Sequence, residues 1–143
     1  MNKLSPKLAE MTREEWRELG FYYIIDDDSK AWNLYGSVDG LSNFITEILK
    51  FTARDEVKGE HEHLLPHWYL TLQYDDGFDI CERGILASKI ELLIFIDILK
   101  QLLLKAKVGE IIGLHNHVKS ASYRMYLHVK GADFDPSKLD PQL

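Results

Sequence analysis

Apolar residues recur at helical spacing most clearly between Ala87 and Lys105. Ser88, followed three residues later by Glu91, is typical of a capping box that begins a helix. The face expected to meet a core contains Leu92, Phe95, Ile96, Leu99, Leu102 and Leu103. A second apolar row, formed by Ile90, Ile94 and Ile98, lies beside the polar side of the helix. With this row the helix has more apolar surface than a helix packed on one sheet would bury. We therefore expect this row to be the interface of a homodimer.

The alternative is that another part of the same chain covers this isoleucine row. One candidate is a short helix that begins with a capping box at Thr12 and ends at Gly20, with Trp16 and Leu19 as its anchors. The other is the C-terminal segment, which contains Phe134 and Leu139. Both alternatives would leave the protein a monomer.

Strand and helix patterns alternate along the rest of the chain. Residues 21–26 and 31–36 predict a hairpin, and Ser37 caps a helix expected over residues 38–52. Residues 68–74 alternate, with Trp68, Leu70, Leu72 and Tyr74 on one side. Asp76-Gly77 predicts a hairpin turn into a return strand over 78–84, and residues 123–129 predict a last strand.

This order predicts an α+β two-layer sandwich with a mostly antiparallel five-stranded sheet and two long helices on one face. We expect one domain over residues 1–143, with loosely ordered tails at 1–10 and 131–143. The pattern of hairpin, helix and strand occurs twice, which indicates an internal duplication with a period of roughly 50 residues. The repeats would align Gly59–His63 with Gly113–His117, although a pattern as short as His-x-His also arises by chance.

Composition narrows the function classes. Hydrophobic residues make up 45% of the chain and charged residues 28%, as in globular proteins. A net charge of -6 argues against nucleic-acid binding. The single cysteine, Cys81, excludes an intramolecular disulfide. The apolar run 90–104 is too short and too charged to span a bilayer, so we expect a cytoplasmic protein without membrane contact.

Histidines provide the sharpest chemical lead. In an extended segment residues i and i+2 share a side, so His61 and His63 could meet one Zn ion, with His67 as a third ligand. Following the chain through the expected sheet places this cluster and the pair His115/His117 at opposite ends. The alternative is that these are loop histidines that hydrogen-bond locally. The chain contains no recognisable nucleophile–base or phosphate-binding motif, so we expect no catalytic residues and no cofactor.

The sheet face turned away from the helices is the second lead. If Trp68, Leu70, Leu72 and Tyr74 face the helices, Tyr69 and Gln73 lie on the opposite side. By the same alternation the last strand places Arg124, Tyr126 and His128 there. Because Tyr and Arg are enriched at interaction hot spots, we expect these five residues to bind a protein partner. A merely solvated face, on which Tyr reflects strand propensity, is the alternative.

One resemblance bears on function. The run LYGSVDGLSNFITEILKFTA, followed by GEHEHLLPHWYLTLQ, covers residues 32–74 and resembles small α+β immunity proteins of bacterial polymorphic toxin systems. The resemblance implies a cytoplasmic protein that binds and silences a cognate toxin without catalysis. A protein-binding function is therefore the leading hypothesis. The alternatives are a small metal-dependent enzyme that uses His61, His63 and His67, and a structural homo-oligomeric module.

Overall fold

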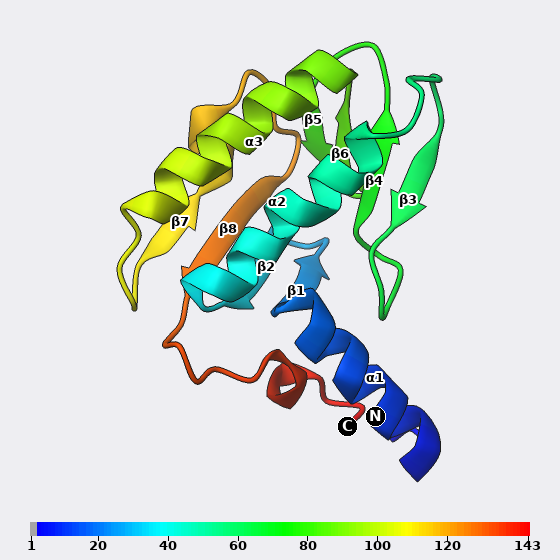
Figure 1. Cartoon of the computed structure of the whole chain (residues 1–143), viewed down its shortest axis with the longest axis vertical. Helices are drawn as coiled ribbons and strands as arrows, with labels where there is room; N and C mark the ends of the chain where they lie inside the picture. Colours follow the sequence, from blue (N-terminus) through cyan, green and yellow to red (C-terminus); the bar gives the residue numbers. More distant parts are fainter. Residues whose placement is uncertain (1–2) are drawn as a thin grey trace.

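The computed structural model describes residues 3–143, which form three α-helices, two short 3-10 helices and eight strands. In chain order the elements are α1 (Pro6–Leu19), β1 (Phe21–Asp26), β2 (Ala31–Gly36), α2 (Val38–Thr52), β3 (His61–His63), β4 (Thr71–Tyr74), β5 (Asp79–Cys81), β6 (Gly84–Ala87), α3 (Lys89–Leu104), β7 (Ile111–Gly113), η1 (Leu114–His117), β8 (Arg124–Val129) and η2 (Pro136–Leu139). Helices α2 and α3 lie side by side in front of the strands (Figure 1).

The strands are divided between two sheets. Their orders are β1-β2-β8-β7 and β3-β4-β6-β5, and both sheets mix parallel and antiparallel pairing. The α+β class is confirmed, whereas the single five-stranded, mostly antiparallel sheet is wrong. The sequence pattern missed β3 and β7, which are only three residues long, and β6, which lies between the expected return strand and α3. It also could not show that strands far apart in sequence pair with each other.

The two sheets share one topology. In each, two antiparallel pairs meet through a parallel contact between their inner strands, β2 with β8 and β4 with β6. The chain therefore repeats one unit: β1-β2-α2-β3-β4, then β5-β6-α3-β7-β8. Each sheet takes one pair from each unit, so neither unit can bury its apolar residues without the other.

Four phenylalanines mark the centre of this repeat. Phe21 of β1 packs on Phe44 of α2 with ring centroids 5.6 Å apart, and Phe78 packs on Phe95 of α3 at 5.3 Å. Phe44 and Phe95, at equivalent positions of the two helices, touch each other edge to face at 6.3 Å. The approximate two-fold axis that relates the units therefore passes between these two rings.

The repeat corrects the predicted alignment of the histidines. Gly59 and Gly109 both have a φ of 92°. The N–H of Gly59 donates to Tyr74 O at 2.9 Å, and the N–H of Gly109 donates to Val129 O at 2.8 Å. These glycines are therefore equivalent, and the expected pairing of Gly59 with Gly113 is shifted by several residues. His67, rather than His63, is the counterpart of His117.

Local capping signals placed the two long helices well. Ser37 Oγ accepts the N–H of Gly40 at 3.0 Å, and Ser88 Oγ accepts the N–H of Glu91 at 3.2 Å. Gly20 ends α1 in the left-handed region, as expected. The start of α1 differs from the expectation, because Ser5 rather than Thr12 caps it. Residues 6–10, expected to be loose, are therefore helical.

The expected hairpin across Asp76-Gly77 does not form. Strand β4 pairs in parallel with β6, and the antiparallel hairpin is β5-β6. Gly84 permits this arrangement: a Cβ there would lie 2.3 Å from Thr71 O, so any side chain would separate the two strands. With β6 seated against β4, β5 is displaced to the edge of the sheet.

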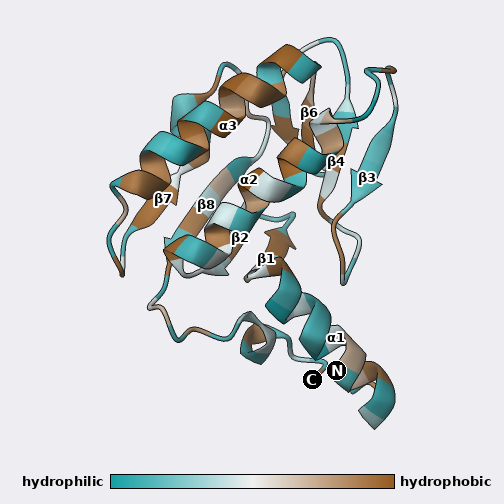
Figure 2. Cartoon of the chain, in the orientation of Figure 1, coloured by the Kyte–Doolittle hydropathy of each residue, from teal (hydrophilic) through white to brown (hydrophobic). Residues whose placement is uncertain are grey.

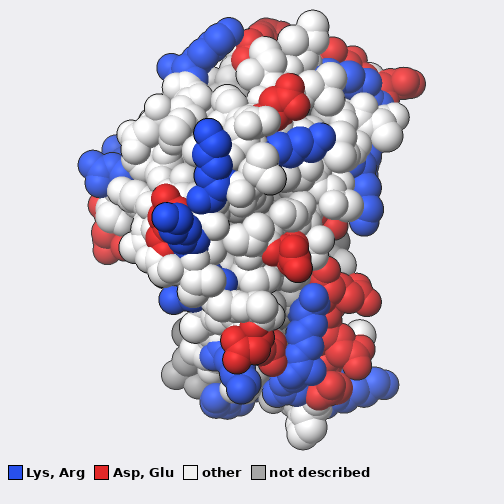
Figure 3. All heavy atoms as spheres, turned by 60° about the vertical axis from the view of Figure 1, so that its left-hand side comes forward, with Lys and Arg blue, Asp and Glu red and all other residues white. Residues whose placement is uncertain are grey.

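The C-terminal segment is anchored rather than trailing. Its 3-10 helix η2 packs against α1 and β1 (Figure 1), and Ser137 and Asp140 are buried there. Charged side chains crowd this lower part of the molecule in Figure 3, and α1 is the most hydrophilic helix in Figure 2. Neither α1 nor η2 covers α3 in Figure 1, so within residues 3–143 neither of the two segments offered as the alternative covers the isoleucine row.

Candidate functional site

The segment between β3 and β4, residues 64–70, forms a loop with a fixed backbone. Its two ends are tied together, because the N–H of Leu64 donates to Leu70 O at 2.8 Å. The hydroxyl of Tyr23 donates to Leu64 O from β1. His63 Nδ1 lies 3.0 Å from Trp68 O and 3.1 Å from Thr71 Oγ1, so the His63 ring bridges the loop and β4. The loop is thus held from three sides before any partner arrives.

The aromatic side chains of this loop point outward. Trp68 is 59% exposed and Tyr69 is 63% exposed, and Leu65 is exposed beside them. Trp68 also has a φ of 68°, in the left-handed region that a bulky residue rarely adopts. Trp68 was expected inside β4, facing the core, and this expectation is wrong: β4 begins only at Thr71. We call the segment 64–70, with its exposed Leu65, Trp68 and Tyr69, the aromatic loop.

The buried carboxylate of Asp140 anchors the loop through His67. Asp140 Oδ2 accepts the Nε1–H of Trp16 at 2.9 Å and lies 2.7 Å from His67 Nε2. Its Oδ1 accepts the N–H of Gln142 at 2.9 Å. Burial acts to raise the pKa of the Asp140 carboxyl, but these donors outweigh it and hold the pKa below its usual value. Asp140 therefore joins the C-terminal segment, α1 and the loop.

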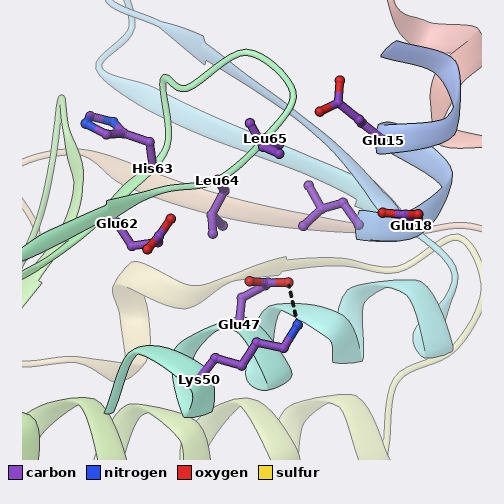
Figure 4. Close-up of a pocket in the computed structure, with 9 residues that line it drawn as sticks. Glu15, Glu18, Glu47, Lys50, Glu62, His63, Leu64 and Leu65 are labelled. Atoms are coloured by element: carbon purple, nitrogen blue, oxygen red, sulfur yellow. Dashed lines mark ion pairs between the residues drawn. The ribbon is translucent and has the colours of Figure 1, made fainter. Parts of the chain in front are cut away.

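An acidic cleft of about 290 Å³ lies beside the aromatic loop (Figure 4). Glu15 and Glu18 project into it from α1, Glu47 from α2 and Glu62 from β3. Lys50 pairs with Glu47 at 3.6 Å, and Arg54 pairs with Glu62. Within residues 3–143 no cation pairs with Glu15 or Glu18. The cleft therefore presents negative charge toward solvent.

The histidines expected to bind metal serve separate roles. The rings of His61 and His63 are 5.1 Å apart on β3, whereas His67 turns toward Asp140. In the described part of the chain no three His, Cys, Asp or Glu side chains are placed to hold a metal ion. Strand β3, which carries His61 and His63, and strand β7 lie at opposite edges of the molecule in Figure 1. His115 and His117 belong to η1, which follows β7 directly.

The residues expected on one open sheet face lie in a loop and on two different sheets. Tyr69 belongs to the aromatic loop and Gln73 to β4, whereas Arg124, Tyr126 and His128 lie on β8. On β8 the expected alternation holds, because Met125, Leu127 and Val129 are buried. His128 stacks on Tyr35 at 4.2 Å and lies 2.7 Å from Asn33 Oδ1. Burial, with Lys130 nearby, lowers the pKa of His128.

Sequence reasoning identified Tyr69 but missed the rest of this site. Pro66 signals that a regular strand cannot run through the segment, so Trp68 need not follow the alternation of β4. Nothing in the sequence pattern indicated the cleft, since its carboxylates come from three elements. Cys81 is buried, and burial raises the pKa of its thiol, so it is not activated as a nucleophile.

Comparisons with known proteins identified no relative of this chain. No protein-family model matches the chain, and searches of curated proteins and of solved structures found no match. Within residues 3–143 no helix combines the length and the apolar character that crossing a membrane requires.

Proposed function

We propose that this protein is a non-enzymatic binding protein whose aromatic loop docks into a partner protein. The observation that carries the proposal is Trp68, a bulky residue held at a φ of 68° with 59% of its surface exposed. Such a conformation costs of order 1 kcal/mol and persists only where the surroundings impose it. Exposure means that Trp68 gains little packing within its own chain. Contact with a partner would explain why Trp68 is held exposed in this unfavourable backbone conformation.

The loop has the properties of a preformed interaction hot spot. Trp and Tyr are the side chains that most often dominate binding energies, and Leu65 extends their apolar surface. Tyr23 and His63 already hold the loop backbone, and Asp140 holds the His67 side chain, so the partner need not order the loop on binding. This preorganisation favours a tight complex.

The negative charge beside the aromatic loop favours a basic partner. The acidic cleft flanks the aromatic loop, and the whole chain has a net charge of -6. A basic protein surface would be steered toward this region and would neutralise Glu15 and Glu18 on docking. The proposed partner is therefore a protein with a basic patch beside an apolar hollow.

The resemblance to immunity proteins supports a more specific version of the proposal. It spans residues 32–74 and so includes the aromatic loop itself. On this reading the partner is a bacterial toxin, and the protein acts in the cytoplasm by covering a surface that the toxin needs. The zinc enzyme alternative has less support, because His67 Nε2 is committed to Asp140.

The test is binding to the products of neighbouring genes, measured with the full chain. We expect one product to form a stable complex, and to arrest growth when expressed without this protein. Because a central aromatic hot spot is worth about 2 kcal/mol, Trp68→Ala and Tyr69→Ala should each weaken binding about 30-fold.

A matched control separates this site from general surface effects. Ile111 on β7 has the same exposed fraction as Trp68 but lies at the opposite edge of the molecule, so Ile111→Ala should bind like wild type. The proposal is overturned if no neighbouring product binds. Binding that survives the double replacement of Trp68 and Tyr69 by Ala would remove the aromatic loop as the site.

A further inference from the structure

The outward face of α3 carries a row of exposed residues at regular spacing. Ile90 is 70% exposed, Ile94 49% and Leu104 79%, and Asp97 and Gln101 are exposed between them. The steps along this row alternate four and three residues, which is the spacing of a seam along which two helices pack. The row, Ile90, Ile94, Asp97, Gln101 and Leu104, is called the α3 seam below.

The protein's own core does not use this seam. Helix α3 meets the core through Leu92, Phe95, Ile96, Leu99 and Leu103, all of them buried. Ile98, expected in the exposed row, is half-buried, and Leu93 is exposed instead. Figure 3 brings the side of α3 and β7 forward, and there charged side chains are scattered over a surface made mostly of other residues. Exposed apolar side chains that gather on one helix, as Ile90, Ile94 and Leu104 do on α3, are typical of an interaction site.

Comparison with α2 shows that the seam is specific to the second unit. The positions in α2 that correspond to Ile90 and Ile94 are Asp39 and Asn43. In the first unit this face lies against the end of α1, and Asn43 Nδ2 donates to Leu19 O at 2.9 Å. In α3 the same positions are isoleucines. The second unit thus offers an apolar face where the first has a polar contact with its own chain.

We propose that the α3 seam binds the α3 seam of a second copy in an antiparallel, two-fold symmetric dimer. Four of the five seam residues are self-complementary about the level of Leu99, and Ile90 lies beyond the matched region. With the helices antiparallel, Ile94 lies opposite the partner's Leu104, and Asp97 lies opposite the partner's Gln101. Two apolar layers then flank a central polar layer in which the Gln101 amide can donate to the Asp97 carboxylate.

The polar centre of the seam selects this direction of packing. In a parallel pair Asp97 would face the partner's Asp97, and two like charges would be brought together. In the antiparallel pair each Asp97 lies opposite an uncharged Gln101 instead. An apolar groove on an unrelated protein would leave Asp97 and Gln101 without matching partners. The arrangement of the seam therefore favours a second copy.

This inference goes beyond the proposed binding function and can fail separately from it. The aromatic loop joins β3 to β4, apart from α3, so a dimer through the seam leaves both loops free (Figure 1). A dimer would present two loops to partner molecules.

The first experiment measures the mass of the full chain in solution by light scattering and sedimentation. We expect twice the chain mass of 16.6 kDa at micromolar concentration. Ile94→Glu and Leu104→Glu should each raise the dimer dissociation constant about 100-fold, because each buries a carboxylate against an apolar layer. Leu49→Glu, at an exposed apolar position of α2, is the matched control and should remain dimeric. Circular dichroism verifies that each variant is folded.

The second experiment tests the direction of packing by disulfide cross-linking. A chain with both Ile94→Cys and Leu104→Cys should form a covalent dimer on mild oxidation, whereas each single variant should not, because only unlike positions face each other. Cys81 is buried and does not interfere. A wild-type monomer at micromolar concentration would overturn the proposal and leave the seam to a different protein. Efficient cross-linking of the Ile94→Cys variant alone would contradict the antiparallel arrangement.

Discussion

Asp140→Ala should destabilise the protein far more than a substitution in a C-terminal segment ordinarily does. The Asp140 side chain is 1% exposed, and it accepts from Trp16 Nε1, which is fully buried, and contacts His67 Nε2. Removing the carboxylate leaves the buried indole N–H unpaired, which costs about 1–3 kcal/mol. Loss of the bond to His67 adds about 1 kcal/mol. We expect a total loss of about 3 kcal/mol in the free energy of unfolding.

Urea denaturation followed by far-UV circular dichroism measures this loss. With a denaturant slope of about 2 kcal/mol per molar, typical of small domains, the unfolding midpoint should fall by about 1.5 M. Asp133→Ala, at an exposed position of the same segment, is the control and should not move the midpoint. In a chain that already carries Trp16→Phe, Asp140→Ala should cost less free energy of unfolding, because no indole N–H is then left without an acceptor. A loss below about 1 kcal/mol for Asp140→Ala would refute the anchoring role.

Two further predictions concern other contacts of the fold. Arg17 holds the pKa of Asp135 at about 2, below its value of 3.8 in an unfolded chain, so this ion pair stabilises the protein above about pH 4 and the contribution is lost as pH falls toward 2. Asp135→Asn should therefore cost about 1 kcal/mol at pH 7, since the pair is partly exposed, and the difference from wild type should vanish near pH 2 in acid titrations of stability. Gly40→Ala should cost about 2 kcal/mol despite the better helix propensity of Ala, because a Cβ there would lie 2.1 Å from Gly20 O. Gly77→Ala, where a Cβ meets nothing within 4 Å, should be close to neutral in the same melts, and equal effects at the two glycines would contradict the close approach of α1 to α2.

The candidate site was only partly predictable. Tyr69 was identified from strand alternation, but for the wrong reason, because it lies in a loop and not on a sheet face. Trp68 was assigned to the core, because the alternation of residues 70–74 was extended back to Trp68, two residues after Pro66. Asp140 carried no sequence signal at all. Its role arises because the two ends of the chain meet, with Trp16 and His67 converging on one carboxylate.

The sequence by itself determined helices α2 and α3, the end of α1 and the strands β1, β2 and β8, because caps, periodicity and breakers act within a few residues. Ser37, Ser88 and Gly20 fix helix ends through hydrogen bonds or backbone conformations that each segment forms alone. Only the tertiary structure decided which strands became neighbours. Alternation tells which side of a strand is buried but not which strand lies beside it. That choice depends on distant contacts, such as the backbone of β4 seated against Gly84 and the two units closing around Phe44 and Phe95.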